Sequence, residues 1–116
     1  MLFKFPKDDK NFSWTSHSKT KMLQYRISEQ KIKTVLKNPS RKEEGVAPKT
    51  AAVMMRHDTP KRKEEIWAMY QELSQKLKGE SRKLRVISVW RYPGVSPIGK
   101  AIPIPQDILD ELTNMI

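Results

Sequence analysis

The chain has 116 residues, enough for one domain, and its 23 Lys and Arg against 13 Asp and Glu give a formal net charge of +10. It contains no cysteine, which excludes disulfides and thiolate chemistry. No stretch approaches the ~18 apolar residues of a membrane-spanning helix, and the N-terminus lacks the apolar run of a signal peptide. We therefore expect a cytoplasmic protein with no membrane contact.

Positive charge is concentrated in the first hundred residues. Residues 1–100 hold all 23 basic residues and 10 of the acidic ones, a net +13, whereas residues 101–116 hold −3. A basic body of this kind attracts phosphate backbones and speeds encounters with them. The simpler alternative is a surface kept soluble by its charge.

The first predicted elements follow a flexible leader at residues 1–10. Residues 12–15 alternate apolar and polar side chains, which is typical of a short strand. A helix is expected from residue 17 to about residue 25, with Ser16 as its N-cap.

The second helix has clearer start and stop signals. Ser28 is a good N-cap, and Ile27 and Ile32 have the spacing of a hydrophobic staple. Asn38-Pro39 ends the helix, because the residue before a proline is driven out of the helical conformation.

The middle of the chain contains one ambiguous segment. Residues 50–55 indicate a strand buried on both faces, and a basic loop follows at 56–63. The apolar residues of 64–77 have helical spacing, which favours a helix, but the aromatic and apolar stretch 65–71 also suits a strand.

The clearest predicted strand lies at residues 84–90, which are β-branched and apolar. The prolines of 93–105 then indicate an extended connector poor in hydrogen bonds. A final helix begins near Pro105, a residue favoured at the first helical position. The predicted domain thus covers residues 11–92, and residues 93–116 add the connector and a C-terminal helix.

The two histidines are the candidates for general acid or base chemistry, because only imidazoles ordinarily titrate near neutral pH. His17 stands at a helix start beside Lys19, where local capping or packing is the simpler explanation. His57 stands in a basic loop, where a solvated histidine without a catalytic role is favoured. Neither has neighbouring cysteines, and few carboxylates lie close in sequence. We therefore expect no metal site, and no cofactor motif is present.

Arg91 and Tyr92 directly follow the strand at 84–90, and loops at the rim of a sheet commonly carry binding residues. An arginine there could hold or stabilise a phosphate, and a tyrosine could stack on a base. Trp90 could stack in the same way if it were exposed, but a core position is favoured for it. For Arg91 the alternative is an ordinary surface cation.

Two basic clusters flank the ambiguous segment. Their members are Lys61, Arg62 and Lys63 in the first, and Arg82, Lys83 and Arg85 in the second. If 64–71 and 84–90 form a hairpin, both clusters flank one pair of strands and could line a phosphate track. Such contacts hold the RNA backbone without reading its sequence.

The N-terminal part carries a pattern familiar from small bacterial domains. Its three segments are Trp14-Thr15-Ser16-His17-Ser18-Lys19-Thr20-Lys21-Met22, Ile27-Ser28-Glu29-Gln30-Lys31-Ile32 and Val35-Leu36-Lys37-Asn38-Pro39. The pattern resembles an uncharacterised family of such domains and, distantly, the BrnT toxins and the RelE/ParE superfamily of toxin–antitoxin proteins. The resemblance covers residues 12–39 well and 84–92 loosely, and 40–83 match in the order of elements only.

The last strand extends this resemblance in part. BrnT-like proteins carry Arg-Ile-Ile-Ser-Ala-Arg-Lys there. The corresponding residues here are Arg85-Val86-Ile87-Ser88-Val89-Trp90-Arg91. Trp90 takes the place of the family's arginine, and Arg91 falls where its lysine would be.

The resemblance implies two helices packed on an antiparallel sheet in which 64–71 is a strand paired with 84–90. It also implies metal-independent cleavage of mRNA, by attack of a ribose 2′-hydroxyl on the adjacent phosphate. In that mechanism His17 or Lys19 acts as acid or base, and Arg91 stabilises the phosphate.

We therefore predict an α+β fold of RelE/BrnT type, with two N-terminal helices on a mainly antiparallel sheet of about four strands and an added C-terminal helix. The predicted function is a toxin-type RNA-binding protein that acts on mRNA or at the ribosome, with endoribonuclease activity as a hypothesis. One alternative is a non-catalytic nucleic-acid- or ribosome-binding module. Another is a toxin-like partner of an acidic antitoxin protein.

Overall fold

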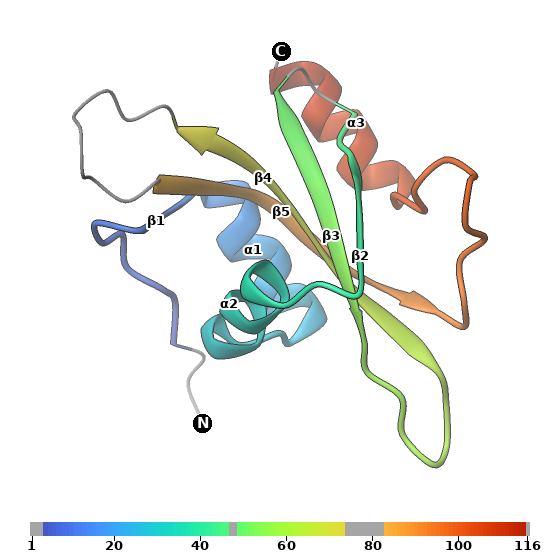
Figure 1. Ribbon diagram of the computed structural model, residues 1–116. Helices are drawn as coiled ribbons and strands as arrows, with labels where there is room; N and C mark the ends of the chain where they lie inside the picture. Colours follow the sequence, from blue (N-terminus) through green and yellow to red (C-terminus); the bar gives the residue numbers. More distant parts are fainter. Residues whose placement is uncertain (1–3, 47–48, 74–82, 116) are drawn as a thin grey trace.

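Five strands form one sheet in the order β1-β5-β4-β3-β2 (Figure 1). The strands are β1 (Phe12–Trp14), β2 (Arg41–Glu44), β3 (Thr50–Arg56), β4 (Glu64–Leu73) and β5 (Lys83–Pro93). β1 pairs with β5 in parallel, and the other three pairs of neighbouring strands in this sheet are antiparallel. The computed structural model describes residues 4–46, 49–73 and 83–115, and within them the predicted α+β class is confirmed.

β2 is the strand that the sequence did not indicate, since about four were expected. Its four residues are Arg41, Lys42, Glu43 and Glu44, without one apolar side chain. It pairs with β3 at the edge of the sheet, and its side chains alternate between half-buried and exposed. An edge strand can be charged because it does not have to fill a core, so no hydrophobic pattern marks it.

β4 corrects the expectation of a helix that spacing alone favoured over residues 64–77. Residues 64–73 form a central strand between β3 and β5, as the resemblance implied. Its first seven residues are all buried, because two helices cover one face of the sheet here, and the C-terminal helix with the connector before it covers the other. A strand buried on both faces has a continuous apolar run, which periodicity cannot distinguish from a helix. Residues 74–77 lie outside the described residues.

The helices α1 (Ser16–Tyr25) and α2 (Glu29–Lys37) cover one face of the sheet (Figure 1). Ser28 caps α2 as predicted, since its side chain accepts a hydrogen bond from the backbone of Lys31 at 3.1 Å. Thr15, rather than Ser16, caps α1, accepting from the backbone of Ser18 at 3.0 Å. The core between this helical layer and the sheet contains Met22, Ile27, Ile32, Val35, Val53, Ile66 and Val89.

The helix α3 (Gln106–Met115) packs on the opposite face, as the predicted C-terminal helix. Ile108 and Leu112 are buried against the stacked rings of Trp67 and Trp90, whose centroids lie 5.8 Å apart with the ring planes at 4°. Trp90 therefore belongs to the core, which confirms the position that the sequence favoured for it.

The chain between β5 and α3 is held to the sheet by one buried carboxylate. Glu65 is 0% exposed and accepts hydrogen bonds from Ser96, at 2.9 Å from its backbone and 2.6 Å from its hydroxyl. It also accepts from Trp67 Nε1 at 2.9 Å and from Arg56 at 3.2 Å. Burial opposes the charge of Glu65, but these donors outweigh it and hold its pKa below the ordinary value. The connector that was expected to be poor in hydrogen bonds is thus tethered at Ser96.

Replacing Glu65 with glutamine should lower stability by about 1–3 kcal/mol, because the buried donors lose their charged acceptor. Urea unfolding followed by tryptophan fluorescence measures this as a lower midpoint. The matched control is Glu44→Gln on the exposed side of β2, which should change stability by less than about 0.5 kcal/mol. Equal midpoints for the two variants would contradict an anchoring role for Glu65.

Candidate nucleic-acid interface

The turn between β3 and β4 presents three cations, Lys61, Arg62 and Lys63, which we call the basic turn. Thr59 and Arg62 form a small bridge, with N–H···O distances of 2.8 and 3.2 Å, and the Thr59 hydroxyl accepts from the backbone of Lys61 at 3.3 Å. The turn thus satisfies its own backbone. All three side chains are exposed, and none forms an ion pair in the described part of the chain.

Lys83 and Arg85 of the second basic cluster lie at the other end of the paired strands β4 and β5. Lys83 pairs with Leu73 at the far end of β4, whereas the basic turn directly precedes Glu64 at its start. A ten-residue strand spans roughly 33 Å. The pairing of β4 with β5 is as expected, but it separates Lys83 and Arg85 from the basic turn instead of aligning them with it on one phosphate track. Arg85 is exposed, Lys83 is half-buried, and Arg82 lies outside the described residues.

His17 lies under α3, with only 7% of its side chain exposed. Its Nε2 is 2.9 Å from the hydroxyl of Ser88, and its Nδ1 bonds the carboxylate of Glu111. The order of contacts, from Ser88 through His17 to Glu111, matches that of a nucleophile, its general base and the acid that orients the base. However, Ser88 is 0% exposed, so no substrate can reach its hydroxyl. The contacts instead attach α3 to α1 and β5.

Arg91 is engaged at the opposite end of α1. Its Nε and Nη2 donate to the carbonyl oxygens of Tyr25 and Arg26 at 2.8 and 3.1 Å. These are carbonyls at a helix end, which need donors from outside the helix. Its Nη1 donates to Glu64 at 2.5 Å.

The structure does not bring the three predicted catalytic residues together. Arg91 reaches the C-terminal end of α1, whereas His17 is close to the N-terminal end of that helix and bonds a residue of α3. Lys19 is half-buried, and its side chain makes no hydrogen bond in the described part of the chain. Tyr92, the predicted stacking residue, is half-buried against the cluster around Trp67.

The histidine to which we assigned no role lies beside Arg91 instead. His57 Nδ1 is 2.9 Å from Oε2 of Glu64, the same oxygen that accepts from Arg91. Burial of Glu64 opposes its charge, but the hydrogen bond from His57 and the charge of Arg91 hold its pKa below the ordinary value. Once a β3–β4 hairpin is assumed, the seven-residue spacing of His57 and Glu64 around the turn would have predicted that the two residues face each other.

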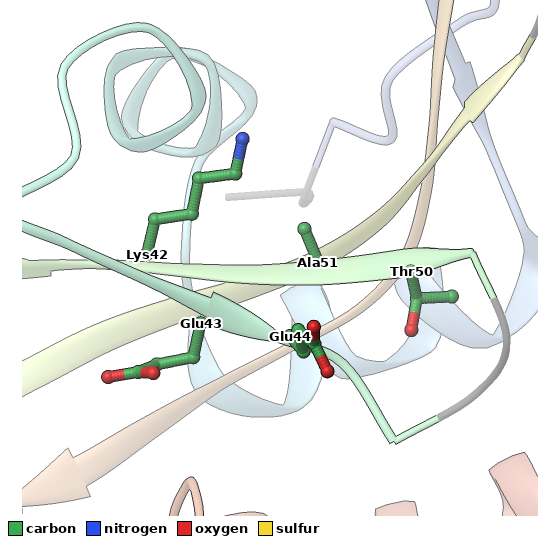
Figure 2. Close-up of a pocket in the computed structure, with 5 residues that line it drawn as sticks. All are labelled: Lys42, Glu43, Glu44, Thr50 and Ala51. Atoms are coloured by element: carbon green, nitrogen blue, oxygen red, sulfur yellow. The ribbon is translucent and has the colours of Figure 1, made fainter. Parts of the chain in front are cut away.

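An open hollow of about 410 Å³ lies between β2 and β3, lined by Lys42, Glu43, Glu44, Thr50 and Ala51. Figure 2 shows Lys42 and Glu43 pointing to opposite sides of their strand, so these charges do not converge on one ligand. Among the described residues, no group of three His, Asp or Glu side chains lies close enough together to bind a metal ion.

Comparisons of the chain with protein families, with curated proteins and with solved structures found no match. The likeness to BrnT and RelE-type toxins therefore stays a prediction. None of the described helices is both long enough and apolar enough to cross a membrane.

Acid should weaken the attachment of α3. Lys21 is 5% exposed and bonds Asp107 at 2.5 Å, and this hydrogen bond holds the pKa of Asp107 below its ordinary value. A lowered folded-state pKa means that the stabilisation is present at neutral pH and is lost as the pH falls through that pKa, below about 4.

We expect Asp107→Asn to lower the free energy of unfolding at pH 7 by up to about 1 kcal/mol, because the carboxylate is half exposed, and urea unfolding measures this as a lower midpoint. The difference from the wild type should shrink towards about pH 3. The control is Asp110→Asn, which removes a charge from the same helix while its side-chain oxygen can still accept from Gln106. A difference that stays constant with pH would rule out the ion pair as its source.

Proposed function

We propose that the protein binds RNA through the basic turn and does so without reading the base sequence. The observation that carries the proposal is the set of three exposed cations on a turn whose own backbone bonds fix it. Exposed cations on a fixed backbone, with no ion pair to a carboxylate among the described residues, are available for phosphates, and phosphate contacts dominate nucleic-acid affinity.

The distribution of ion pairs supports the same proposal. Two carboxylates near the turn form ion pairs with arginines outside it: Asp58 pairs with Arg56, and Glu64 pairs with Arg91. The excess of positive charge is therefore left on the outside. Because these pairs neutralise each other at the foot of the turn, little negative charge remains there to repel a phosphate backbone.

Further positive charge lies next to the turn. Arg26 is exposed at the C-terminal end of α1, and its carbonyl accepts from Arg91, which in turn bonds Glu64 directly after the turn. An RNA strand bound to the basic turn would therefore meet cations from two parts of the protein, the turn itself and the end of α1. The resemblance to RelE-type toxins favours RNA over DNA as the polyanion.

The triple variant Lys61→Ala, Arg62→Ala, Lys63→Ala should bind RNA more weakly, and with less salt dependence. Each lost phosphate contact changes the slope of log K against log salt by about 0.7 for a single strand, so the slope should fall by about 2. Fluorescence anisotropy with a labelled single-stranded RNA, titrated at about 50 to 200 mM salt, measures both quantities.

The matched control is the triple variant Lys4→Ala, Lys7→Ala, Lys10→Ala, which removes the same charge from three exposed lysines far from the turn in sequence. It should keep most of the slope of the wild type. If the two triple variants lose affinity equally, net charge rather than the basic turn accounts for binding, and the proposal fails.

A further inference from the structure

His57 and Glu64 face each other at the foot of the β3–β4 hairpin. The backbone N–H of His57 donates to the carbonyl of Glu64 at 2.9 Å, and the side chains meet at the same distance. An ionised carboxylate only accepts hydrogen bonds, so Nδ1 of the histidine carries the proton that it donates. In the neutral imidazole, Nε2 is then left with a free lone pair.

The imidazole is accessible. The side chain of His57 is 37% exposed, against 7% for His17, and Nε2 has no partner in the described part of the chain. Glu64 itself is only 8% exposed. A buried carboxylate that orients an exposed histidine is the usual support for a general base.

Arg91 completes the cluster because it bonds the same carboxylate oxygen as His57. A guanidinium has five N–H groups. Three of those of Arg91 are used, by Tyr25, Arg26 and Glu64, so two remain on a side chain that is 26% exposed. An anchored arginine with spare donors is suited to a phosphate.

Several contacts hold the foot of the hairpin in place. Asp58 accepts from the backbone of Glu64 at 3.1 Å and pairs with Arg56 at 2.5 Å. On the β5 side, the backbone of Gly94 donates to the carbonyl of Lys63 at 2.7 Å. Groups fixed in this way lose little freedom when a substrate binds.

We propose that His57, oriented by Glu64 and accompanied by Arg91, is the general base of an RNA-cleaving site at the foot of the basic turn. The inference rests on the proposed function, because the basic turn must bring the RNA backbone to the imidazole.

The reaction is an internal transfer of the phosphate. Nε2 of His57 takes the proton of a ribose 2′-hydroxyl, the 2′ oxygen attacks the adjacent phosphorus, and the bond from phosphorus to the 5′ oxygen breaks. Arg91 stabilises the charge on the phosphate oxygens. The leaving 5′ oxygen takes a proton from water, and the hydroxide formed removes the proton from the imidazolium. The products are a 2′,3′-cyclic phosphate and a 5′-hydroxyl, and no co-reactant is consumed.

The test is cleavage of a labelled single-stranded RNA in the presence of a chelator, with RNA binding measured in parallel. His57→Asn keeps a side-chain N–H for Glu64 but has no basic nitrogen. Its cleavage rate should fall by about 10² or more, which is the usual contribution of a general base, whereas its RNA affinity should stay within about twofold. The RNA should end in a cyclic phosphate, and its 2′-O-methyl counterpart should bind but stay intact.

A second variant makes the role of the imidazole specific. His57→Ala should also be inactive, and added free imidazole should restore part of its cleavage, which a loss of folding would not allow. Lys100→Ala, an exposed lysine of the connector, is the control and should cleave as the wild type does.

The outcomes separate the two proposals. RNA that is bound but left intact by the wild type would overturn the cleavage site and leave the proposed function standing. Undiminished cleavage by His57→Asn would show that the base lies elsewhere and would also overturn the site. A wild type that neither binds nor cleaves RNA would overturn both proposals.

Discussion

Two consecutive glutamates at the start of β4 hold the layers of this protein together. Because successive side chains of a strand point to opposite faces, Glu64 faces the layer of α1 and α2, and Glu65 faces the connector to α3. Glu64 binds Arg91, which holds the end of α1, and Glu65 binds Ser96, which holds the connector. One dipeptide in the central strand therefore sets the position of the elements on both sides of the sheet.

Buried carboxylates of this kind contribute more to a defined arrangement than to net stability. Taking a charge out of water costs several kcal/mol, and its partners return that energy only when their geometry is good. Glu65 has four donors within 3.2 Å, so its charge is well compensated. An arrangement in which Ser96 or Arg56 were displaced would leave that charge without partners, and this penalty disfavours other packings of the connector.

The parts of the fold that depend on neighbouring residues could be predicted from the sequence. The start of α2 at Ser28 and the core position of Trp90 are examples, since a cap and an apolar strand are both visible locally. β2 has no apolar residue to reveal it. The candidate site was harder to predict, because the contacts of Arg91 with Tyr25 and of His17 with Glu111 join residues 66 and 94 positions apart. No spacing in the sequence records such pairs. His57 was missed for a different reason, because its partner Glu64 is only seven residues away but faces it only once β3 and β4 are known to form a hairpin.

The charged edge strand β2 has a consequence for how these molecules behave at high concentration. It is the last strand of the described sheet on its side, so it could in principle receive a strand from a second molecule. Such an added strand would have to lie against Lys42 and Glu44, which are both exposed and strongly hydrated. Charged edge strands of this type discourage the repeated addition of strands from other molecules to the edge of the sheet. The charged side chains of β2, which left no hydrophobic pattern to predict it by, thus also limit growth of the sheet into an aggregate.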